Sequence, residues 1–295
     1  MKTIAVIGAG TMGNGIAHVF AQQGFQVHLV DLSEERLRKG LQTIEKNLER
    51  MVKKEVIESG VVAQTLANIK SFTEIAEAVG NSGLVIEAAT EDANLKKQIF
   101  IELDSHCPAE TILATNTSSI SITEIAAVTT RPEKVIGMHF MNPVPVMKLV
   151  EVIRGYSTSD AVTETILELS RKLGKIPTEV NDYPGFIANR ILMPMINEAI
   201  ESLFHGIAGV QEIDTVMKLG MGHPMGPLQL ADFIGLDVCL SILEVLYEGF
   251  KNPKYAPCPL LVKMVAAGKL GVKSGEGFYD YSQSRKAEQV AAQFL

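Results

Sequence analysis

The sequence predicts an α/β protein with a doubly wound, mostly parallel sheet and an inserted helical hairpin, followed by an all-α domain. Three observations predict this fold class. The chain opens with an apolar strand, a glycine-rich turn and a helix. Short apolar runs then alternate with helical stretches up to about residue 180, which is typical of parallel sheets. Beyond that point the apolar residues follow helical spacing alone.

The composition is that of a globular protein with unpaired cysteines. The chain has 295 residues, 46% of them hydrophobic, and a formal charge of −7. This acidic balance does not suit the phosphate backbone of nucleic acids, so no nucleic-acid partner is expected. Cys107, Cys239 and Cys258 show no CxxC spacing, which argues against disulfides and zinc and predicts a cytoplasmic protein without a metal. The short apolar start runs into glycine, so neither a signal peptide nor a membrane span is expected.

The first motif predicts a dinucleotide-binding turn. The strand Thr3–Ile7 leads into Gly8-Ala9-Gly10-Thr11-Met12-Gly13, a GxGxxG fingerprint, and a helix follows. In a Rossmann-type fold these glycines permit a tight turn, close approach of the backbone to a pyrophosphate, and close packing of helix on strand. The pyrophosphate binds the free N–H groups and the positive dipole end of the helix.

The next strand indicates which cofactor is bound. Phe25–Val30 is apolar and ends in Asp31, about twenty residues beyond the turn, where a carboxylate accepts hydrogen bonds from the adenine ribose hydroxyls. Leu32 follows in place of an arginine that would hold a 2′-phosphate. The sequence therefore favours NAD over NADP and does not exclude NADP.

A helical hairpin is expected over about residues 33–67, between the second and third strands. Ser33 is the expected N-cap of its first helix, and Val61–Ala67 is the expected second helix. The apolar positions of the first helix are Leu37, Leu41, Ile44, Leu48 and Val52. These positions recur every three or four residues, as in an amphipathic helix. Glu55-Val56-Ile57 contains no glycine or proline, so the turn between the helices is not located.

Four basic side chains share one face of the first hairpin helix. They are Lys46, Arg50, Lys53 and Lys54. On an acidic protein such a face suits an anionic ligand. The alternative is a charged face that is only solvated.

The remaining elements complete the sheet and define a second domain. Strands are expected at Ile69–Phe72, Leu84–Ala89, Thr111–Thr115, Val135–Phe140, Lys148–Ile153 and Ile176–Val180, and helices at Asn94–His106 and Thr163–Leu173. Pro143 and Pro145 predict a turn that places Phe140 beside Leu149. Turn-forming residues at 181–185 predict a boundary between an NAD-binding domain, 1–183, and an all-helical substrate and dimerisation domain, 184–295.

The second domain has more apolar surface than its size can bury. Its helices are expected at Phe186–Phe204, Val210–Leu219, Gly226–Gly249 and Pro259–Gly268. Several are apolar on more than one face. The sequence therefore predicts a homodimer, or a higher oligomer, assembled through this domain.

His139 and Glu151 are the strongest catalytic candidates. His139 stands near the end of an apolar strand, at the sheet edge where open α/β folds bind ligands. Glu151 lies inside the next apolar strand, where a carboxylate is costly unless it is paired. If the two strands are neighbours, Glu151 orients the imidazole and raises its basicity, which suits removal of a proton from a hydroxyl.

For other polar residues at the same edge, the sequence gives weaker evidence of a role in binding or catalysis. Ser118, in the run Thr115–Ser119, can donate a hydrogen bond to a ligand, but turn chemistry explains it equally well. Asn189 begins the first helix of the second domain. Glu91 and Lys96 follow the fourth strand, where a solvated helix start is the alternative.

Together these motifs resemble the L-3-hydroxyacyl-CoA dehydrogenase family, and most closely its short bacterial 3-hydroxybutyryl-CoA members. The motifs are Gly8–Ala17, Asn116–Ser119, His139–Pro143, Gly185–Arg190, Gly226-Pro227 with Asp232–Asp237, and Gly275–Tyr279. They cover essentially the whole chain in order.

The resemblance implies a role for each site residue. His139 would be the general base and Glu151 its partner, while Ser118 and Asn189 would hydrogen-bond the acyl substrate. Besides the glycine-rich turn, the implied cofactor contacts are Asp31, Glu91, Lys96, Asn116, Ser118, Asn142 and Lys273. The hairpin would bind CoA, with Arg50, Lys53 and Lys54 on its phosphates.

The expected reaction is reversible NAD(H)-dependent oxidation of an L-3-hydroxyacyl-CoA, with 3-hydroxybutyryl-CoA and acetoacetyl-CoA as the expected pair. Two alternatives stay open. One is a β-hydroxyacid dehydrogenase acting on a free acid through a catalytic lysine, for which Lys218 is the candidate. The other is a dinucleotide-binding protein without turnover.

Overall fold

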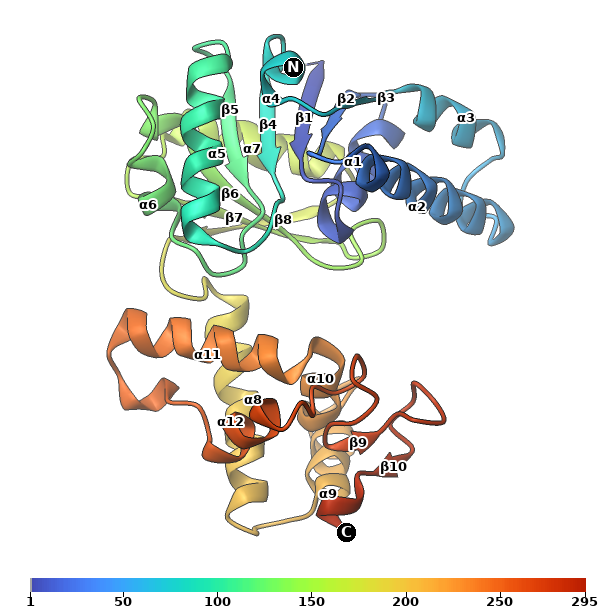
Figure 1. Ribbon diagram of the computed structural model, residues 1–295, viewed down its shortest axis with the longest axis vertical. Helices are drawn as coiled ribbons and strands as arrows, with labels where there is room; N and C mark the ends of the chain where they lie inside the picture. Colours follow the sequence, from blue (N-terminus) through green and yellow to red (C-terminus); the bar gives the residue numbers. More distant parts are fainter. Residues whose placement is uncertain (1) are drawn as a thin grey trace. The chain divides into compact units, whose positions relative to one another are not determined.

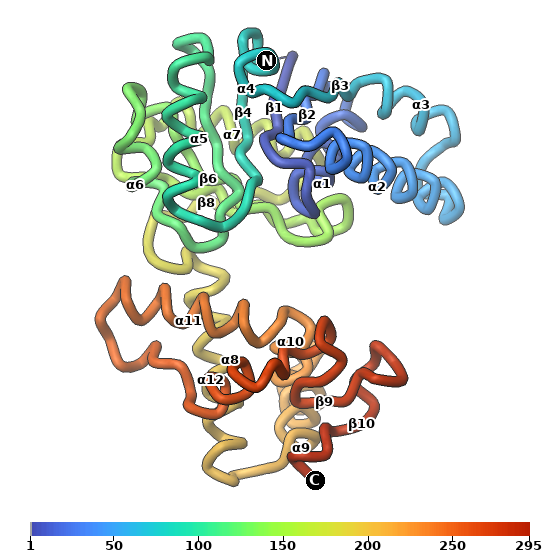
Figure 2. The backbone as a smooth tube through the Cα atoms, in the orientation of Figure 1, coloured from blue at the N-terminus to red at the C-terminus, as the bar shows by residue number. Residues whose placement is uncertain are grey.

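The computed structural model describes residues 2–295, which form two compact units. The first unit ends at Tyr183, and the second spans Pro184–Leu295. The chain passes once from the first unit to the second, as the colours of Figure 2 show. None of the helices between residues 2 and 295 is long and apolar enough to cross a lipid bilayer.

An eight-stranded sheet forms the centre of the first unit. Its strands are β1 (Thr3–Ile7), β2 (Gln26–Val30), β3 (Ile69–Phe72), β4 (Leu84–Glu87), β5 (Ile112–Thr115), β6 (Val135–Phe140), β7 (Leu149–Arg154) and β8 (Ile176–Asn181). Their spatial order is β3-β2-β1-β4-β5-β6-β7-β8, and every pair is parallel except β6 and β7. The direction of winding reverses between β1 and β4, so the predicted doubly wound sheet is confirmed.

Helices cover both faces of this sheet. They are α1 (Thr11–Gln22), α2 (Glu34–Lys53), α3 (Gly60–Ala67), α4 (Ile75–Val79), α5 (Ala93–His106), α6 (Ile122–Ala126) and α7 (Asp160–Lys172). Figure 1 shows α5 and α6 in front of the sheet and α7 behind it. The short helices α4 and α6 and the 3₁₀ turn Pro132–Lys134 were not predicted. Segments of three to five residues are too short to display a helical period.

The predicted helical hairpin is confirmed as α2 and α3, which pack on each other and on α1. Ser33 caps α2, because its side chain accepts a hydrogen bond from the Arg36 N–H. The turn after α2 uses Glu55 at a φ of +57°, a left-handed conformation that glycine usually supplies. A search for glycine or proline could therefore not locate this turn.

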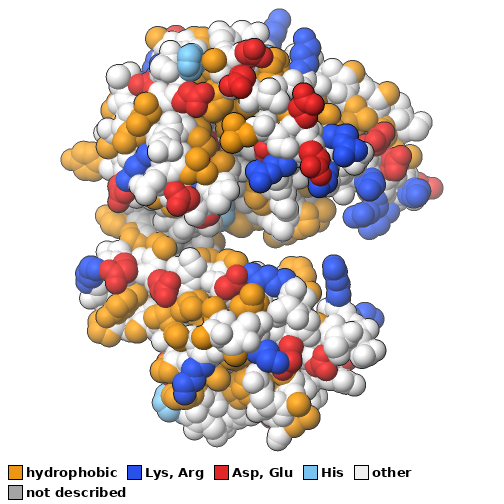
Figure 3. Space-filling model, in the orientation of Figure 1, with side chains coloured by type: hydrophobic (Ala, Val, Ile, Leu, Met, Phe, Trp, Pro, Cys, Tyr) orange, Lys and Arg blue, Asp and Glu red, His pale blue; other side chains and the backbone are white. Residues whose placement is uncertain are grey.

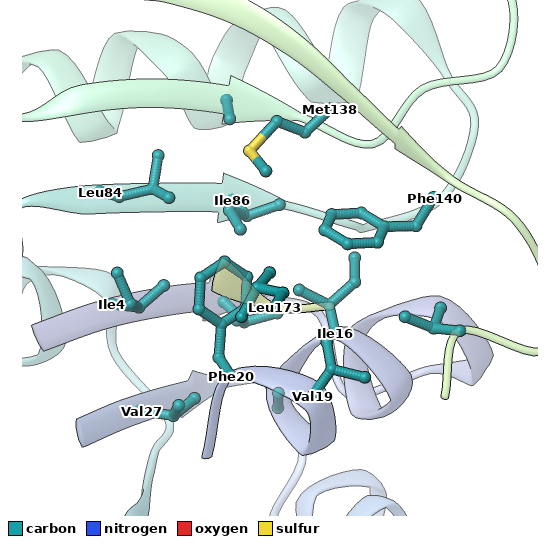
Figure 4. Close-up of a cluster of buried hydrophobic side chains, with 14 of the residues drawn as sticks. Ile4, Ile16, Val19, Phe20, Val27, Leu84, Ile86, Met138, Phe140 and Leu173 are labelled. Atoms are coloured by element: carbon teal, nitrogen blue, oxygen red, sulfur yellow. The ribbon is translucent and has the colours of Figure 1, made fainter. Parts of the chain in front are cut away.

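One apolar cluster joins α1 and α7 to the sheet. Figure 4 shows Ile16 and Phe20 of α1 pointing into the same cluster as Ile4, Ile86 and Phe140 from the strands. The glycine-rich turn permits this close packing, since a Cβ on Gly13 would lie 1.8 Å from the Gly8 carbonyl oxygen. The third glycine of the fingerprint thus has the packing role predicted for it.

The second unit is helical with a short β-ribbon near its end. Its helices are α8 (Ala188–Phe204), α9 (Val210–Thr215), α10 (Pro227–Ile234), α11 (Leu236–Phe250) and α12 (Pro259–Ala266), and its strands are β9 (Tyr279–Asp280) and β10 (Gln289–Val290). The ribbon was not predicted, because two-residue strands carry no alternation.

Two predicted helices of this unit were wrong in extent. The single helix expected at Gly226–Gly249 is broken into α10 and α11 by Gly235, whose φ is +105°. The helix expected at Val210–Leu219 is α-helical only to Thr215, and a π-helical turn, Val216–Gly220, continues it. The spacing of apolar residues does not reveal a helix break at one glycine or a change from α-helical to π-helical hydrogen bonding.

Two buried carboxylates organise the second unit. Asp214 accepts hydrogen bonds from the Leu228 and Gln229 N–H groups, at the start of α10, and from the Tyr279 hydroxyl at 2.8 Å. Asp232 accepts from the Phe278 and Tyr279 N–H groups and thereby attaches the β-ribbon to α10. Burial raises the pKa of Asp232 to about 7 and also raises the pKa of Asp214.

Candidate active site

The glycine-rich turn lines an open cleft at the carboxyl ends of β1, β2 and β4. The cleft has a volume of about 710 Å³, and its walls include Gly8–Met12, Asp31 and Ala88–Thr90. A Cβ on Gly10 would meet nothing within 4 Å, so the turn faces open space. No side chain caps the first turn of α1, which leaves N–H groups for an anion. These features fit a dinucleotide whose pyrophosphate lies against the turn.

Asp31 is held at the end of β2 by the turn itself. Its Oδ2 accepts a hydrogen bond from the Ala9 N–H at 3.0 Å. Arg36 Nη1 lies 3.8 Å from Asp31 Oδ1, and Arg36 and Lys39 both line the cleft. The prediction of NAD rested on Leu32, next to Asp31, and did not include Arg36, which the first turn of α2 brings back to the cleft.

His139 and Glu151 are cross-strand partners. They face each other in the antiparallel register of β6 and β7, and His139 Nδ1 lies 2.8 Å from Glu151 Oε2. Both residues are buried, Glu151 almost completely. Since a carboxylate can only accept, Nδ1 carries the hydrogen of this bond and Nε2 remains as the basic atom of the neutral ring.

Glu91 accepts several hydrogen bonds from the loop after β5. Its Oε1 accepts hydrogen bonds from the Thr117 hydroxyl at 2.6 Å, the Ser118 N–H at 2.9 Å, and the Ser118 and Ser119 hydroxyls at 3.2 Å each. Burial would raise the pKa of Glu91, but the Lys96 ammonium and the bonds from Thr117 and Ser118 outweigh it, so the pKa lies below its ordinary value. Glu91 therefore stays ionised and orients Ser118.

Lys96 is a buried ammonium rather than the exposed helix-start cation that the sequence left as an alternative. Its Nζ lies 2.7 Å from Glu87 Oε1 and 3.4 Å from Glu91 Oε2. Glu87 also accepts from the Ala89 N–H and the Thr115 hydroxyl. Glu87 was not predicted as a site residue. Like Glu151, it is a carboxylate inside an apolar strand, which is the feature that identified Glu151.

The remaining predicted site residues fall in both units. In the first unit, Asn116 Oδ1 accepts from the Phe140 N–H at 2.9 Å, which links the loop after β5 to β6, and Asn142 is exposed in the turn after β6. In the second unit, Asn189 is buried in the first turn of α8, and Lys273 pairs with Asp237 at 2.6 Å. The catalytic and binding roles of these residues remain predictions.

The basic face of the hairpin is exposed. Lys46, Arg50, Lys53 and Lys54 all lie on the solvent side of α2 and its C-cap. Figure 3 shows Lys and Arg side chains gathered over the far end of this helix. Among residues 2–295 there is no group of three His, Cys, Asp or Glu side chains placed to hold a metal ion.

Comparison with known families matches the two units separately. Residues 3–183 match the model of the 3-hydroxyacyl-CoA dehydrogenase NAD-binding domain, and residues 185–281 match the model of the C-terminal domain of the same family.

Individual relatives match over nearly the whole chain. A probable 3-hydroxybutyryl-CoA dehydrogenase of Bacillus subtilis is 54% identical over 96% of this chain and 98% of its own. Human mitochondrial hydroxyacyl-coenzyme A dehydrogenase is 45% identical over 95% of this chain and 91% of its own. The crystal structure of (S)-3-hydroxybutyryl-CoA dehydrogenase PaaH1 from Ralstonia eutropha superposes with a TM-score of 0.94 at 50% identity, covering 96% of this chain and all of that one. The chain therefore belongs to the 3-hydroxyacyl-CoA dehydrogenase family, and its first unit is the NAD-binding domain of that family.

Proposed function

We propose that this protein catalyses the reversible oxidation of L-3-hydroxybutyryl-CoA to acetoacetyl-CoA with NAD. The observation that carries the proposal is the buried hydrogen bond between His139 and Glu151, on two strands of the sheet that also carries the dinucleotide-binding turn. The names of the relatives from Bacillus subtilis and Ralstonia eutropha support the four-carbon acyl group.

His139 is the general base of the oxidation. Its Nε2 takes the proton of the substrate hydroxyl, since Nδ1 is engaged with Glu151. Glu151 fixes the orientation of the ring and stabilises the imidazolium that forms. When bound, NAD supplies the acceptor for the hydride that leaves C3 of the substrate. The oxidation releases one proton and the reduction consumes one, so a higher pH is expected to favour oxidation and a lower pH to favour reduction.

Ser118 and Asn189 polarise the substrate oxygen in this proposal. Donors directed at an oxygen that gains negative charge during reduction lower the barrier by a few kcal/mol. Glu91 supports this role through the Ser118 N–H, whose bond to Oε1 holds the loop backbone in place. The Ser118 hydroxyl exchanges its own bond to Glu91 for one to the substrate oxygen, because it has a single hydrogen to donate. Asp31, Glu91, Lys96, Asn116, Ser118, Asn142 and Lys273 are the proposed cofactor contacts outside the glycine-rich turn.

The basic face of α2 is the proposed site for the phosphates of CoA. Arg50, Lys53 and Lys54 are exposed on one helix end of an otherwise acidic protein. Positive side chains on a flexible stem suit the negative charges of the CoA nucleotide.

A homodimer through the second unit is the proposed assembly. Large apolar side chains remain exposed on this unit: Ile191, Phe204, Ile207, Val216, Leu219, Met221, Phe233 and Val262. Exposed apolar surface of this extent is typical of a subunit interface. Light scattering behind size-exclusion chromatography would test the assembly. We also keep the cytoplasm as the proposed location, in agreement with three buried cysteines that form no disulfide.

The test is the loss of NADH absorbance when the protein is mixed with acetoacetyl-CoA. Free acetoacetate and NADPH are the parallel controls. Rapid loss with acetoacetyl-CoA and NADH alone is the expected result. Turnover of free acetoacetate would instead favour a free-acid dehydrogenase, for which Lys218 in the π-helical turn is the candidate lysine. Binding of NADH without turnover of either substrate would contradict an enzymatic function.

A further inference from the structure

A buried lysine lies beneath the loop that joins the two catalytic strands. Lys175 follows α7 and precedes β8, and only 8% of its surface is exposed. Its Nζ donates hydrogen bonds to the carbonyl oxygens of Val144 and Met147, the latter at 2.7 Å. Both acceptors belong to the loop at residues 141–148, between β6 and β7. One side chain therefore binds this loop at two points.

The loop also rests on α1. Val144 is 2% exposed, and a Cβ on Gly15 would lie 2.9 Å from the Val144 Cβ. Only a glycine permits this contact between the helix backbone and the loop. The loop is thus held both by Lys175 and by the dinucleotide-binding helix.

Strand β8 adds a third attachment. The Ile176 N–H, next to Lys175, donates to the Lys148 carbonyl oxygen at 2.8 Å, where the loop enters β7. Within the loop, the Val146 and Met147 N–H groups both donate to the Pro143 carbonyl oxygen. The loop is a compact turn that is also hydrogen-bonded to Lys175 and to β8, so it cannot shift without breaking the bonds to Lys175.

The position of this loop matters for the chemistry proposed above. It begins after Phe140, the residue that follows His139, and ends at Leu149, two residues before Glu151, and it carries Asn142. A shift of the loop would therefore alter the alignment of His139 with Glu151. Misplacement of a catalytic group by about 1 Å can lower the rate by about a hundredfold.

The electrostatic surroundings of Lys175 are consistent with an ammonium group that is held by its hydrogen bonds to the loop. Burial lowers the pKa of Lys175, and such a cost is acceptable only where the ammonium is well hydrogen-bonded. His18 of α1 is fully buried nearby, and burial lowers its pKa to about 4, with the charge of Lys175 acting in the same direction. His18 is therefore neutral at physiological pH and adds no second positive charge beside Lys175.

We propose that Lys175 is a positioning residue of the dehydrogenase reaction: it clamps the loop at residues 141–148 against α1 and so sets the alignment of the His139–Glu151 pair. The inference rests on the proposed function. Lys175 itself touches neither of the two catalytic side chains and acts through the loop backbone.

The test compares Lys175→Met with Lys175→Arg and with the matched control Lys172→Met. Methionine keeps the apolar length of the side chain and removes its donors, whereas arginine keeps donors for both carbonyl groups. Lys172 is an exposed lysine at the end of α7, three residues away. For each variant, kcat and KM for acetoacetyl-CoA, the Kd for NADH and the melting temperature are measured.

At an assay temperature well below the melting temperature of the variant, kcat of Lys175→Met should fall roughly ten- to a hundredfold. The Kd for NADH should stay within about twofold of the wild-type value. Lys175→Arg should recover part of the loss, and Lys172→Met should match wild type. A lower melting temperature with unchanged kcat would show a merely structural lysine and overturn the proposal.

A second variant keeps the proposal testable if Lys175→Met does not fold. Val144→Ala loosens the same loop from the α1 side and leaves both bonds of Lys175 in place. Its kcat is expected to fall roughly tenfold, and a wild-type kcat would overturn the proposal. Inactive wild-type protein would reject the proposed function, and this inference with it. Active wild-type protein with an unaffected Lys175→Met rejects the inference alone.

Discussion

His139 and Glu151 are twelve residues apart in the chain and directly opposite each other in the sheet, with 2.8 Å between Nδ1 and Oε2. This relationship is produced by β6 and β7, which are the only antiparallel neighbours of the sheet among residues 2–295. Because the strands run in opposite directions, the end of one and the beginning of the other meet at the ligand edge. A parallel connection would have needed a crossover of about a dozen residues or more, for which the loop at residues 141–148 is too short.

Asp31 is expected to control the choice of cofactor. Replacing it by serine removes the carboxylate that repels a 2′-phosphate and releases Arg36, which lies 3.8 Å away in the same cleft. Asp31→Ser should raise the ratio of kcat/KM for NADPH to that for NADH by about tenfold or more, which is about 1.4 kcal/mol. Adding Arg36→Met should cancel the gain in NADPH use. An unchanged ratio in the single variant would remove Asp31 from this role.

The basic face of α2 is expected to affect CoA substrates and not the cofactor. Reversing two charges in Arg50→Glu with Lys53→Glu should raise KM for acetoacetyl-CoA by about tenfold at low ionic strength, and by less in high salt. KM for NADH should stay within experimental error. Lys172→Glu, at another exposed lysine of the same unit, provides the control. Equal effects of the two sets of changes would point to a general charge effect.

The Glu87–Lys96 pair is expected to contribute to stability as well as to the site. Both side chains are about 1% exposed or less, so removing Glu87 leaves the buried Lys96 ammonium with the more distant Glu91 Oε2, at 3.4 Å, in place of its closest partner. Glu87→Leu should lower the free energy of unfolding by about 3 kcal/mol. Glu87→Leu combined with Lys96→Met should recover most of this loss. Urea denaturation of the single and double variants measures both effects, and additive losses would contradict the pairing.

Asp232 makes the stability of the second unit dependent on pH. Its pKa of about 7 in the folded protein exceeds the value of about 3.9 expected for an unfolded chain. The folded state therefore binds the proton more tightly, and this contribution is fully present below pH 4 and is lost as the pH rises to 7. The slope is at most about 1.4 kcal/mol per pH unit.

Subtracting the behaviour of Asp232→Asn isolates this effect from the titration of other groups. The variant is expected to be less stable, since an amide nitrogen replaces an acceptor of the Tyr279 N–H or the Tyr281 hydroxyl. Its unfolding free energy should nevertheless lack the decline between pH 4 and 7. If wild type and variant show parallel profiles, Asp232 is ionised throughout this range.

The sheet and the pairing of His139 with Glu151 could be predicted from local features. Apolar runs revealed the strands, and the prolines between Phe140 and Leu149 predicted a tight return that pairs β6 with β7. Glu151 was found because an ionised group inside an apolar strand requires a partner. The same rule would have found Glu87, had it been applied to the strand that ends there.

What could not be predicted depends on contacts between distant residues or on the backbone alone. Lys175 is an ordinary lysine in the sequence, and its role arises only when β8 lies beneath the loop after β6. The break at Gly235 and the turn at Glu55 depend on φ values that no hydrophobic period encodes. Arg36 reaches Asp31 only through the path of the chain into α2.

The most direct test of the account is the turnover of acetoacetyl-CoA by Glu151→Gln. The amide keeps the size of the side chain and removes the charge that stabilises the imidazolium of His139. The account predicts that kcat for acetoacetyl-CoA reduction falls about a hundredfold while the Kd for NADH stays near the wild-type value. A wild-type kcat in this variant would contradict the His139–Glu151 mechanism.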